Sequence, residues 1–212
     1  MTVGALVGSR EEGMTHETSV TIVNVGYRST NYWVVSVGTS RLLVDIGWPG
    51  TLGMMKASLT RMGIPLGQIR YALATHYHID HAGLAEELKR EGVPLLVLDI
   101  QMDALPVMAT WTKPADHYVK ISLEGNVVVS SDESRGILAE IGIAGDILAT
   151  PGHSDHCVSL LLDDGSAFTG DLPPEEAAFD NPVALASWER LRERGARIVY
   201  PAHGPVRPIR GA

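Results

Sequence analysis

Three histidines and one aspartate lie within six residues, directly after the apolar segment Ile69–Ala74, which is predicted to be a buried strand. Residues two apart in an extended backbone point to the same side, so His76 and His78 can face one metal ion. Asp80 and His81 follow where the chain turns into a predicted helix, and they can face a neighbouring point. Imidazole and carboxylate groups suit zinc and other first-row divalent ions. So many of them in so short a segment favour a metal site over a polar surface loop.

Three further imidazole or carboxylate side chains each follow a predicted strand, at the start of a polar loop. They are His153 after the strand at 146–149, Asp171 after the strand at 167–169 and His203 after the strand at 198–200. In α/β proteins, loops just past the strand ends commonly carry functional side chains, because the rigid sheet positions them. Together with the first segment, the chain offers five histidines and two aspartates, enough for two metal ions with water completing the coordination.

The order of the predicted elements indicates a single α/β domain over residues 1–212, built from two halves that each run from strands to a helix. Residues 1–17 are expected to form a loose lead-in, and residues 99–116 to be irregular or partly helical. The predicted strands lie at 20–25, 31–37, 41–46, 69–74, 95–98, 118–121, 127–129, 146–149, 157–162, 167–169 and 198–200, and the predicted helices at 51–62, 83–90, 132–141 and 183–194.

Composition and charge exclude several classes of protein. The 212 residues include one cysteine, Cys157, which rules out an intrachain disulfide framework. No stretch approaches the roughly 20 apolar residues of a membrane span, and residues 1–10 lack a basic start ahead of an apolar patch, so they do not resemble a secretory signal. We therefore expect a cytoplasmic protein without a membrane partner. The net charge of −8 argues against non-specific binding to nucleic acid, because it repels phosphate backbones.

The ordered set of metal-binding residues resembles that of the metallo-β-lactamase-fold hydrolase superfamily. The resemblance rests on His76-x-His78-x-Asp80-His81 followed by His153, Asp171 and His203, and it spans residues 20–205. The segment Leu43-Val44-Asp45-Ile46-Gly47 is also similar to the family's early strand motif, with Ile46 where the family has Thr. The resemblance implies a four-layer αβ/βα sandwich, in which two mixed β-sheets are flanked by helices and the site lies on one edge of the sheets.

The resemblance also implies roles for individual residues. Two divalent ions are expected, zinc first, with iron or manganese as alternatives. A hydroxide bridging the two metals would attack the substrate, and Asp80 would also accept or return a proton. Asp45 would hold the ligand loop in place, although an aspartate that caps a turn is an equal alternative. The implied ligands are His76, His78 and His153 for the first ion, Asp80, His81 and His203 for the second, and Asp171 as the bridge.

The ligand set narrows the class of hydrolase. Zinc β-lactamases with two ions use a cysteine where this chain has Asp171, so a physiological β-lactamase is not expected. The set is similar to that of hydroxyacylglutathione hydrolases and lactonases. With nine residues after His203, however, we expect no C-terminal substrate domain, and Leu172-Pro173-Pro174 follows Asp171, whereas lactonases often have a Tyr near this residue. We expect cleavage of an ester, thioester or lactone in a small-molecule substrate. The alternatives are a phosphodiesterase or nuclease, which normally adds a lysine-rich arm, and a metal-binding sensor without turnover.

Several residues outside the ligand set are weaker candidates. His156 could hydrogen-bond a ligand or the substrate, or it could be a surface residue. Residues 110–118 could form a substrate lid or an ordinary surface loop, and the sequence leaves the oligomeric state open. The side chains predicted to contact substrate are Trp48, Tyr77, Trp111 and His117.

Overall fold

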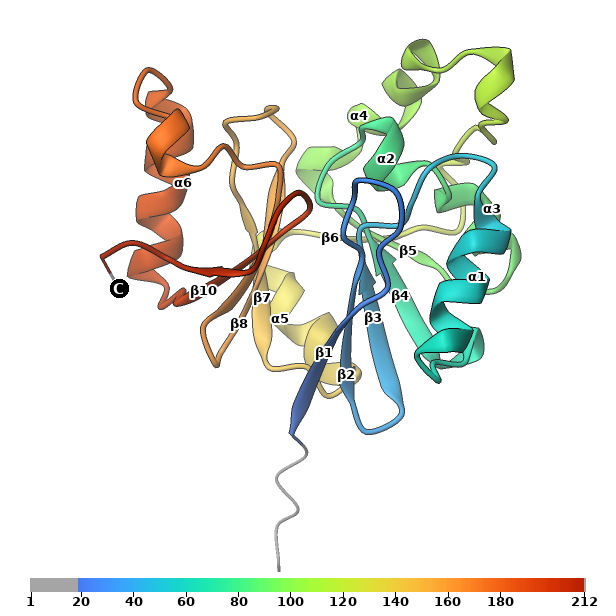
Figure 1. The fold of residues 1–212 in the computed structure, drawn as a ribbon, viewed down its shortest axis with the longest axis horizontal. Coiled ribbons are helices and arrows are strands. Elements are labelled where there is room, and N and C mark those ends of the chain that lie inside the picture. Colours follow the sequence, from blue (N-terminus) through green and yellow to red (C-terminus); the bar gives the residue numbers. More distant parts are fainter. Residues whose placement is uncertain (1–18, 212) are drawn as a thin grey trace, which may run out of the picture.

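Two mixed β-sheets pack face to face between outer helices (Figure 1), as predicted. The computed structural model describes residues 19–211, so the predicted lead-in at 1–17 lies outside the described residues. The sheet orders are β1-β2-β3-β4-β5-β6 and β11-β10-β9-β8-β7. The strands are β1 (Val20–Asn24), β2 (Trp33–Val37), β3 (Ser40–Val44), β4 (Ile69–Leu73), β5 (Leu95–Leu98), β6 (Val127–Val129), β7 (Gly145–Ala149), β8 (Val158–Leu162), β9 (Ser166–Gly170), β10 (Ile198–Pro201) and β11 (Arg207–Pro208). The α-helices are α1 (Leu52–Arg61), α2 (Ile79–Ala82), α3 (Ala85–Arg90), α4 (Ala104–Val107), α5 (Ser131–Glu140) and α6 (Pro182–Glu193).

The strands of the sheet interiors are buried on both faces. In β3, Leu42 and Val44 join the core between the sheets, whereas Leu43 joins the core under the outer helices. The same alternation places Leu96 between the sheets and Val97 under the helices. Successive side chains of a strand point to opposite faces, and a strand covered on both faces reads as a continuous apolar run. This is why uninterrupted apolar segments form strands here.

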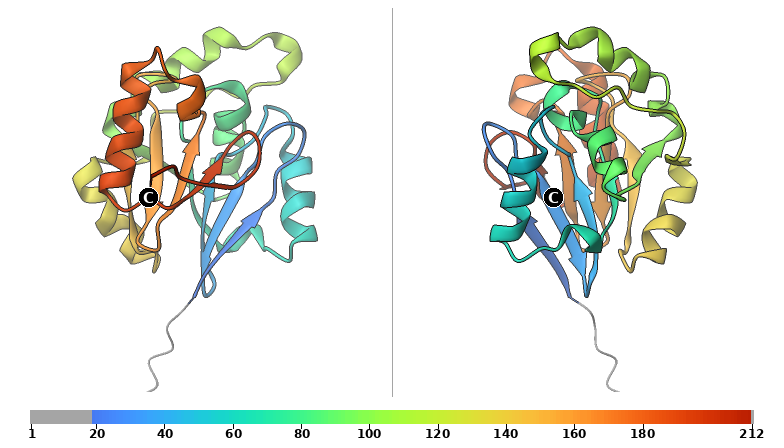
Figure 2. Two further views of the ribbon diagram at one scale, coloured as in Figure 1. Left: turned by 60° about the vertical axis from the view of Figure 1, so that its left-hand side comes forward. Right: turned by 90° about the vertical axis from the view of Figure 1, so that its right-hand side faces the viewer.

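Helices cover the outer face of each sheet, which gives the four layers visible in Figure 2. Helix α1 buries Met55 and Leu59 against the first sheet, and α6 buries Trp188 and Leu191 against the second. Helix α5 packs beside β7, where Leu138 joins the core between the sheets. Each such side chain stabilises the fold by about 1.5–3 kcal/mol when fully buried. Among the described helices, none has the length and apolar character needed to cross a bilayer.

The strand directions bring five loops to one edge of the sandwich. Strand β9 runs parallel to β10, and β8 is antiparallel to both β7 and β9. The carboxyl ends of β7, β9 and β10 therefore share one edge, as do those of the parallel strands β3 and β4 in the other sheet. The Val158 amide donates to the Thr75 carbonyl at 2.8 Å, which joins the two sheets at this edge.

Most predicted elements match the structure to within two residues at each end, but the strand predicted at 118–121 is wrong. The Ile121 amide donates to the Tyr118 hydroxyl at 3.3 Å, so this segment bonds locally instead of pairing with a neighbouring strand. The short helix α2 and the two-residue strand β11 are additional elements. Residues 99–116 consist of helical turns, including α4, in agreement with the expected partly helical segment.

Candidate metal centre

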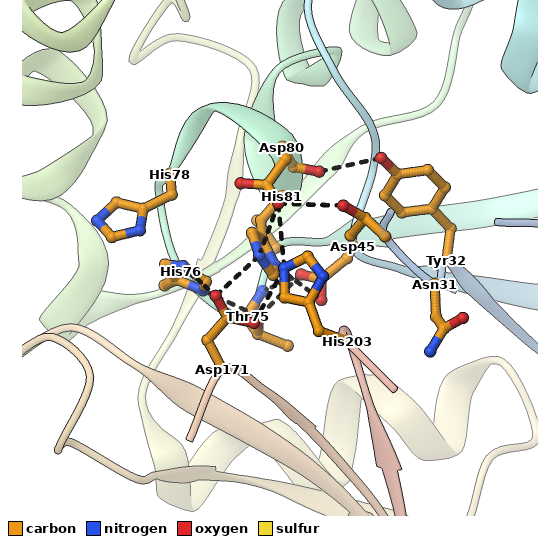
Figure 3. Close-up of polar contacts among 12 residues, drawn as sticks. Asn31, Tyr32, Asp45, Thr75, His76, His78, Asp80, His81, Asp171 and His203 are labelled. Carbon is orange, nitrogen blue, oxygen red and sulfur yellow. Dashed lines mark hydrogen bonds and ion pairs between the residues drawn. The ribbon is translucent and has the colours of Figure 1, made fainter. Parts of the chain in front are cut away.

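The seven predicted ligands meet at the edge that the two sheets share, and six of them are labelled in Figure 3. Strand β4 ends at Leu73, so His76 and His78 lie in the following loop, with their ring centroids 4.6 Å apart. Helix α2 then carries Asp80 and His81. The other three side chains follow the ends of β7, β9 and β10. The site is therefore assembled from both halves of the chain.

The donor atoms form three groups, within each of which the atoms lie within 4.8 Å of one another. The first two groups share no residue, and the third takes one histidine from each of them and adds Asp171. The binding of two ions with Asp171 as the bridge, which the family resemblance implies, stays a prediction. The groups are His76, His78 and His153; Asp80, His81 and His203; and His76, His81 and Asp171.

Asp171 lies between the two groups. Its Oδ2 atom is 3.3 Å from His81 Nε2 and 3.7 Å from His153 Nε2. Its Oδ1 atom is 3.5 Å from His203 Nε2. In the first group, His153 Nε2 and His78 Nδ1 are only 3.0 Å apart. One carboxylate thus contacts histidines of both groups, as a bridging ligand requires.

The loop between β1 and β2 orients the second group. Thr30 Oγ1 donates to Asp80 Oδ2 at 3.0 Å. The Ser29 carbonyl lies 2.7 Å from His203 Nδ1, which leaves His203 Nε2 facing Asp80 Oδ2 at 3.2 Å. A partner on one ring nitrogen fixes the tautomer and the direction of the other nitrogen, a common arrangement for histidines that bind metals.

Asp45 holds the ligand loop from beneath. Its side chain is buried, and its Oδ1 atom accepts hydrogen bonds from the backbone amide and the hydroxyl of Thr75, both at 2.8 Å. Its Oδ2 atom lies 3.1 Å from His81 Nδ1. The φ of +57° puts Asp45 in the left-handed region, which costs roughly 1–2 kcal/mol for a residue with a Cβ. These contacts favour a role in positioning His81 over a role as a simple turn cap.

Burial and neighbouring charges set the protonation of the buried groups. Burial, with a contribution from His81, lowers the pKa of His76 well below its usual value, so this imidazole is neutral. Burial also lowers the pKa of His81, but the carboxylates of Asp45 and Asp171 outweigh burial and raise that pKa to about 10. Burial acts to raise the pKa of Asp171, but His81 and the other neighbouring histidines outweigh burial and lower this pKa below its usual value. Asp171 is therefore ionised. A positive charge is thus favoured at the centre of the cluster, and a divalent cation supplies one.

The residues present fit a metal cluster. The buried side-chain atoms without a hydrogen-bond partner in the described part of the chain include His76 Nε2, His81 Nε2 and Asp171 Oδ1. A buried polar atom without a partner costs about 1–3 kcal/mol, and coordination to a cation removes this cost. All three atoms belong to residues of the donor groups, whose chemistry suits divalent first-row metals.

The remaining predicted site residues fall around two pockets. Tyr77, Trp111 and His156 line a pocket together with His78. Trp48 and His117 line a second pocket, where the Arg28 guanidinium lies 5.6 Å from the Trp48 ring centroid. His156 Nδ1 lies 3.1 Å from the Ile100 carbonyl. Its hydrogen bond to a ligand or substrate stays a prediction, as does closure of residues 110–118 over the site.

Three residues that sequence reasoning missed support the ligands. Ser29 and Thr30 reach the site only because the β1–β2 loop folds against α2, and no motif marks them. Gln101 is fully buried in an irregular segment and donates from Nε2 to the carbonyls of Ala74 and Thr75, at 3.1 and 3.3 Å. A glutamine known to be buried would have indicated a structural role. The sequence does not show that Gln101 is buried, because an irregular segment has no periodic pattern of apolar residues.

Comparison with known proteins gives related sequences along most of the chain. The sequence profile described as the Metallo-beta-lactamase superfamily matches residues 25–203. The Beta-lactamase-like protein 2 homolog of Caenorhabditis elegans is 26% identical over 188 residues, which cover 84% of this chain and 57% of that protein. The lactamase-like protein nscB of Trichophyton rubrum is 31% identical over 189 residues, with coverages of 84% and 50%. An atrochrysone carboxyl ACP thioesterase of Aspergillus fumigatus is 28% identical over 188 residues, with coverages of 84% and 52%. The chain spans about half the length of these relatives.

Solved structures share the fold. The metallo-beta-lactamase family protein TTHA1429 of Thermus thermophilus superposes with a TM-score of 0.66 and 20% identity, covering 90% of this chain and 74% of its own. The protein TTHA1623 in a di-iron-bound form has a TM-score of 0.66 and 23% identity, with coverages of 90% and 95%. At these identities the likeness shows the architecture of the chain.

Proposed function

Because the chain belongs to the metallo-beta-lactamase superfamily, whose members include hydrolases, we propose that it is a hydrolase with a dinuclear zinc centre that cleaves an ester, thioester or lactone. The observation that carries this proposal is the convergence of seven imidazole and carboxylate side chains from both sheets into interlocking donor groups. Zinc is the metal proposed first because the donors are imidazoles and carboxylates. Iron is the alternative, and a related fold holds two iron ions.

The proposed ligands leave one side of the centre open to a substrate. His76 and His81 are buried at its base, whereas His78, His153 and His203 are exposed. Two ions held there would supply a water-derived nucleophile at neutral pH and polarise the carbonyl oxygen of the substrate. The substrate would therefore approach from the side of the exposed histidines, while the fold excludes water from the base.

Asp80 is the proposed proton acceptor as well as a ligand. Its Oδ2 atom lies 3.5 Å from His81 Nε2 and 3.2 Å from His203 Nε2, and Thr30 fixes the carboxylate by a hydrogen bond to the same oxygen. A carboxylate held at the centre can take the proton released when water is activated and return it to the leaving group. Metal content and kcat measured on Asp80→Asn separate the two roles, because loss of proton transfer lowers kcat in molecules that still hold metal.

A thioester is the substrate class that the relatives favour. The relative from Aspergillus fumigatus is named an atrochrysone carboxyl ACP thioesterase. The chemistry is compatible with this site, because a metal centre that polarises an ester carbonyl also polarises a thioester carbonyl. We therefore place a thioester first, before an oxygen ester or a lactone.

The test combines metal analysis with a substrate panel. Purified protein is analysed for bound metal, stripped with a chelator, reloaded with zinc or iron, and assayed on a thioester, an oxygen ester, a lactone and bis(p-nitrophenyl) phosphate. Asp171→Asn removes the proposed bridge, and Asp180→Asn makes the same chemical change at an exposed residue outside the donor groups.

We expect about two metal ions per chain and thioester turnover that chelation abolishes and metal restores. Asp171→Asn is expected to lose at least about 100-fold in kcat/KM, within the range that loss of a metal ligand or a stabilising charge produces. Asp180→Asn is expected to match the wild type. Full activity after complete metal removal would refute the proposal. Selective turnover of the phosphodiester would favour a phosphodiesterase instead, and metal binding without any turnover would favour a sensor.

A further inference from the structure

A pocket beside His78 has an apolar wall formed by one irregular segment. The segment runs through α4 and the following helical turn, and it contributes Ala104, Val107, Met108 and Trp111 to the wall. The rest of the lining comes from loops of the metal centre, including the residue that precedes His78 and the loop after His153. The pocket therefore adjoins the proposed metal site at His78.

The lining of this pocket, as far as the described residues define it, contains no aspartate, glutamate, lysine or arginine. Its volume is about 180 Å³, whereas pockets that enclose a whole drug-sized ligand measure about 300–1,000 Å³. A charged group would lose part of its hydration there without gaining an Asp, Glu, Lys or Arg side chain of opposite charge. The pocket thus suits one neutral, apolar substituent of a larger substrate.

Two apolar side chains of the pocket wall are largely exposed to solvent. Trp111 is 68% exposed and Val107 is 48% exposed. Apolar surface gains free energy when a ligand covers it, and a tryptophan offers a large, rigid contact surface. Because this exposed apolar surface lies next to a candidate metal ligand, a substrate bound at the metal centre is the occupant that the position favours.

Another pocket, which also borders the candidate metal centre, contains charged side chains. Its lining combines His153, His203 and the charged side chains Asp171 and Arg207 with Gly170, Leu172, Pro174 and Pro201, so it differs from the pocket beside His78 in holding charged side chains. A thioester places its carbonyl carbon between an acyl group and a thiol carrier, and carriers are polar or charged. The charged pocket suits the carrier, which leaves the uncharged pocket beside His78 for the acyl group.

We propose that the pocket formed by residues 104–111 beside His78 binds the acyl group of the substrate and selects apolar acyl groups larger than acetyl. This inference rests on the proposed ester or thioester hydrolysis and adds its specificity. Acyl specificity then follows from the irregular segment, and the metal ligands serve every substrate equally.

The test uses thioesters of N-acetylcysteamine with acetyl, butyryl and hexanoyl groups, so that only the acyl group changes. In the wild type, kcat/KM is expected to rise by up to about fourfold per added methylene until the pocket is full. Val107→Asp places a charge in the wall and is expected to lower the hexanoyl-to-acetyl ratio of kcat/KM at least tenfold. Trp111→Ala, at a mostly exposed residue, is expected to change the ratio in the same direction.

The matched control is Val183→Asp. Val183 is 49% exposed, lies in the first turn of α6, where a negative charge is favourable, and belongs to neither pocket at the centre. It should leave both the activity and the acyl ratio unchanged. A second readout is binding of hexanoate and acetate to the zinc-loaded protein by calorimetry, in which Val107→Asp should weaken hexanoate alone.

The outcomes separate this inference from the function on which it rests. Turnover with no dependence on acyl length, or a ratio that Val107→Asp and Val183→Asp change equally, would overturn the acyl pocket and leave the hydrolase intact. A preference set by the thiol rather than by the acyl group would also overturn it. No turnover of any ester or thioester by the metal-loaded protein would overturn the proposed function, and the acyl pocket with it.

Discussion

Replacing Asp45 by Asn tests whether a buried carboxylate beneath the ligand loop determines metal affinity. Asn keeps the shape of the side chain and tolerates the left-handed backbone at φ +57°. Its carbonyl oxygen can still accept both hydrogen bonds from Thr75. The change is therefore confined to the atom that lies 3.1 Å from His81 Nδ1, where an amide nitrogen replaces a carboxylate oxygen.

The expected magnitudes follow from these contacts. Hydrogen bonds to a charged acceptor contribute about 1.5–3 kcal/mol and neutral ones about 0.5–1.5 kcal/mol, so the two bonds from Thr75 together weaken by about 2–3 kcal/mol. Loss of the group that orients a metal-binding histidine costs about 10–100-fold in metal affinity. Asp45→Ala leaves both Thr75 donors without an acceptor, at about 1–3 kcal/mol each, so the free energy of unfolding should fall by about 2–6 kcal/mol.

Zinc affinity is measured by competition with a chromogenic chelator, and stability by urea unfolding of the metal-stripped protein. Asp45→Asn should fold, unfold at lower urea than the wild type and bind zinc about 10–100-fold more weakly. Zinc binding within twofold of the wild type would refute the claim that Asp45 positions His81. A large loss of stability with unchanged affinity would assign Asp45 to the fold alone.

Three further predictions concern other parts of the molecule. Gly170→Ala should lower the free energy of unfolding by about 2–5 kcal/mol, because Gly170 has φ +55° and a Cβ there would lie 2.2 Å from Thr75 Oγ1; a loss under about 1 kcal/mol in urea unfolding would contradict this. Burial raises the pKa of the Cys157 thiol, so iodoacetamide should label it slowly until the protein is denatured, and rapid labelling of native protein by mass spectrometry would argue against this. The hydrogen bond from Arg135 lowers the pKa of Asp163, so its stabilisation is present above the ordinary carboxyl pKa and is lost as pH falls through the lowered value. Asp163→Asn should therefore flatten the acid limb of the stability curve by less than about 1 kcal/mol, since the pair is exposed; an unaltered acid limb would show that the pair contributes nothing.

The fold was predictable where buried strands appear in the sequence as continuous apolar runs. Strands covered on both faces, such as β5 (Leu95–Leu98), are continuous apolar runs, and their boundaries follow from those runs. Strand β11 (Arg207–Pro208) has only two residues and forms through its pairing with β10, so no local pattern marks it. The segment 118–121 has the composition of a strand, but the Tyr118 hydroxyl bonds the Ile121 amide.

The clustering of the candidate ligands was predictable where the chemistry of a side chain and its position in the chain coincide. The predicted ligands are imidazole or carboxylate groups at the ends of apolar strands, so both their type and their place in the chain pointed to one edge. Ser29, Thr30 and Gln101 are ordinary polar residues whose contacts depend on segments far away in the chain. Such contacts arise from the assembled tertiary structure, which a single sequence read locally does not specify.

The donor groups take His76, His78, Asp80 and His81 from the segment after β4 of the first sheet, and His153, Asp171 and His203 from the loops after β7, β9 and β10 of the second. A bound cation would therefore hold the two halves of the sandwich together. The free energy of unfolding would then rise with the free metal concentration, by about 2.7 kcal/mol when that concentration is 100 times the dissociation constant. Cells short of metal would then degrade the protein faster, and its abundance would fall along with its activity.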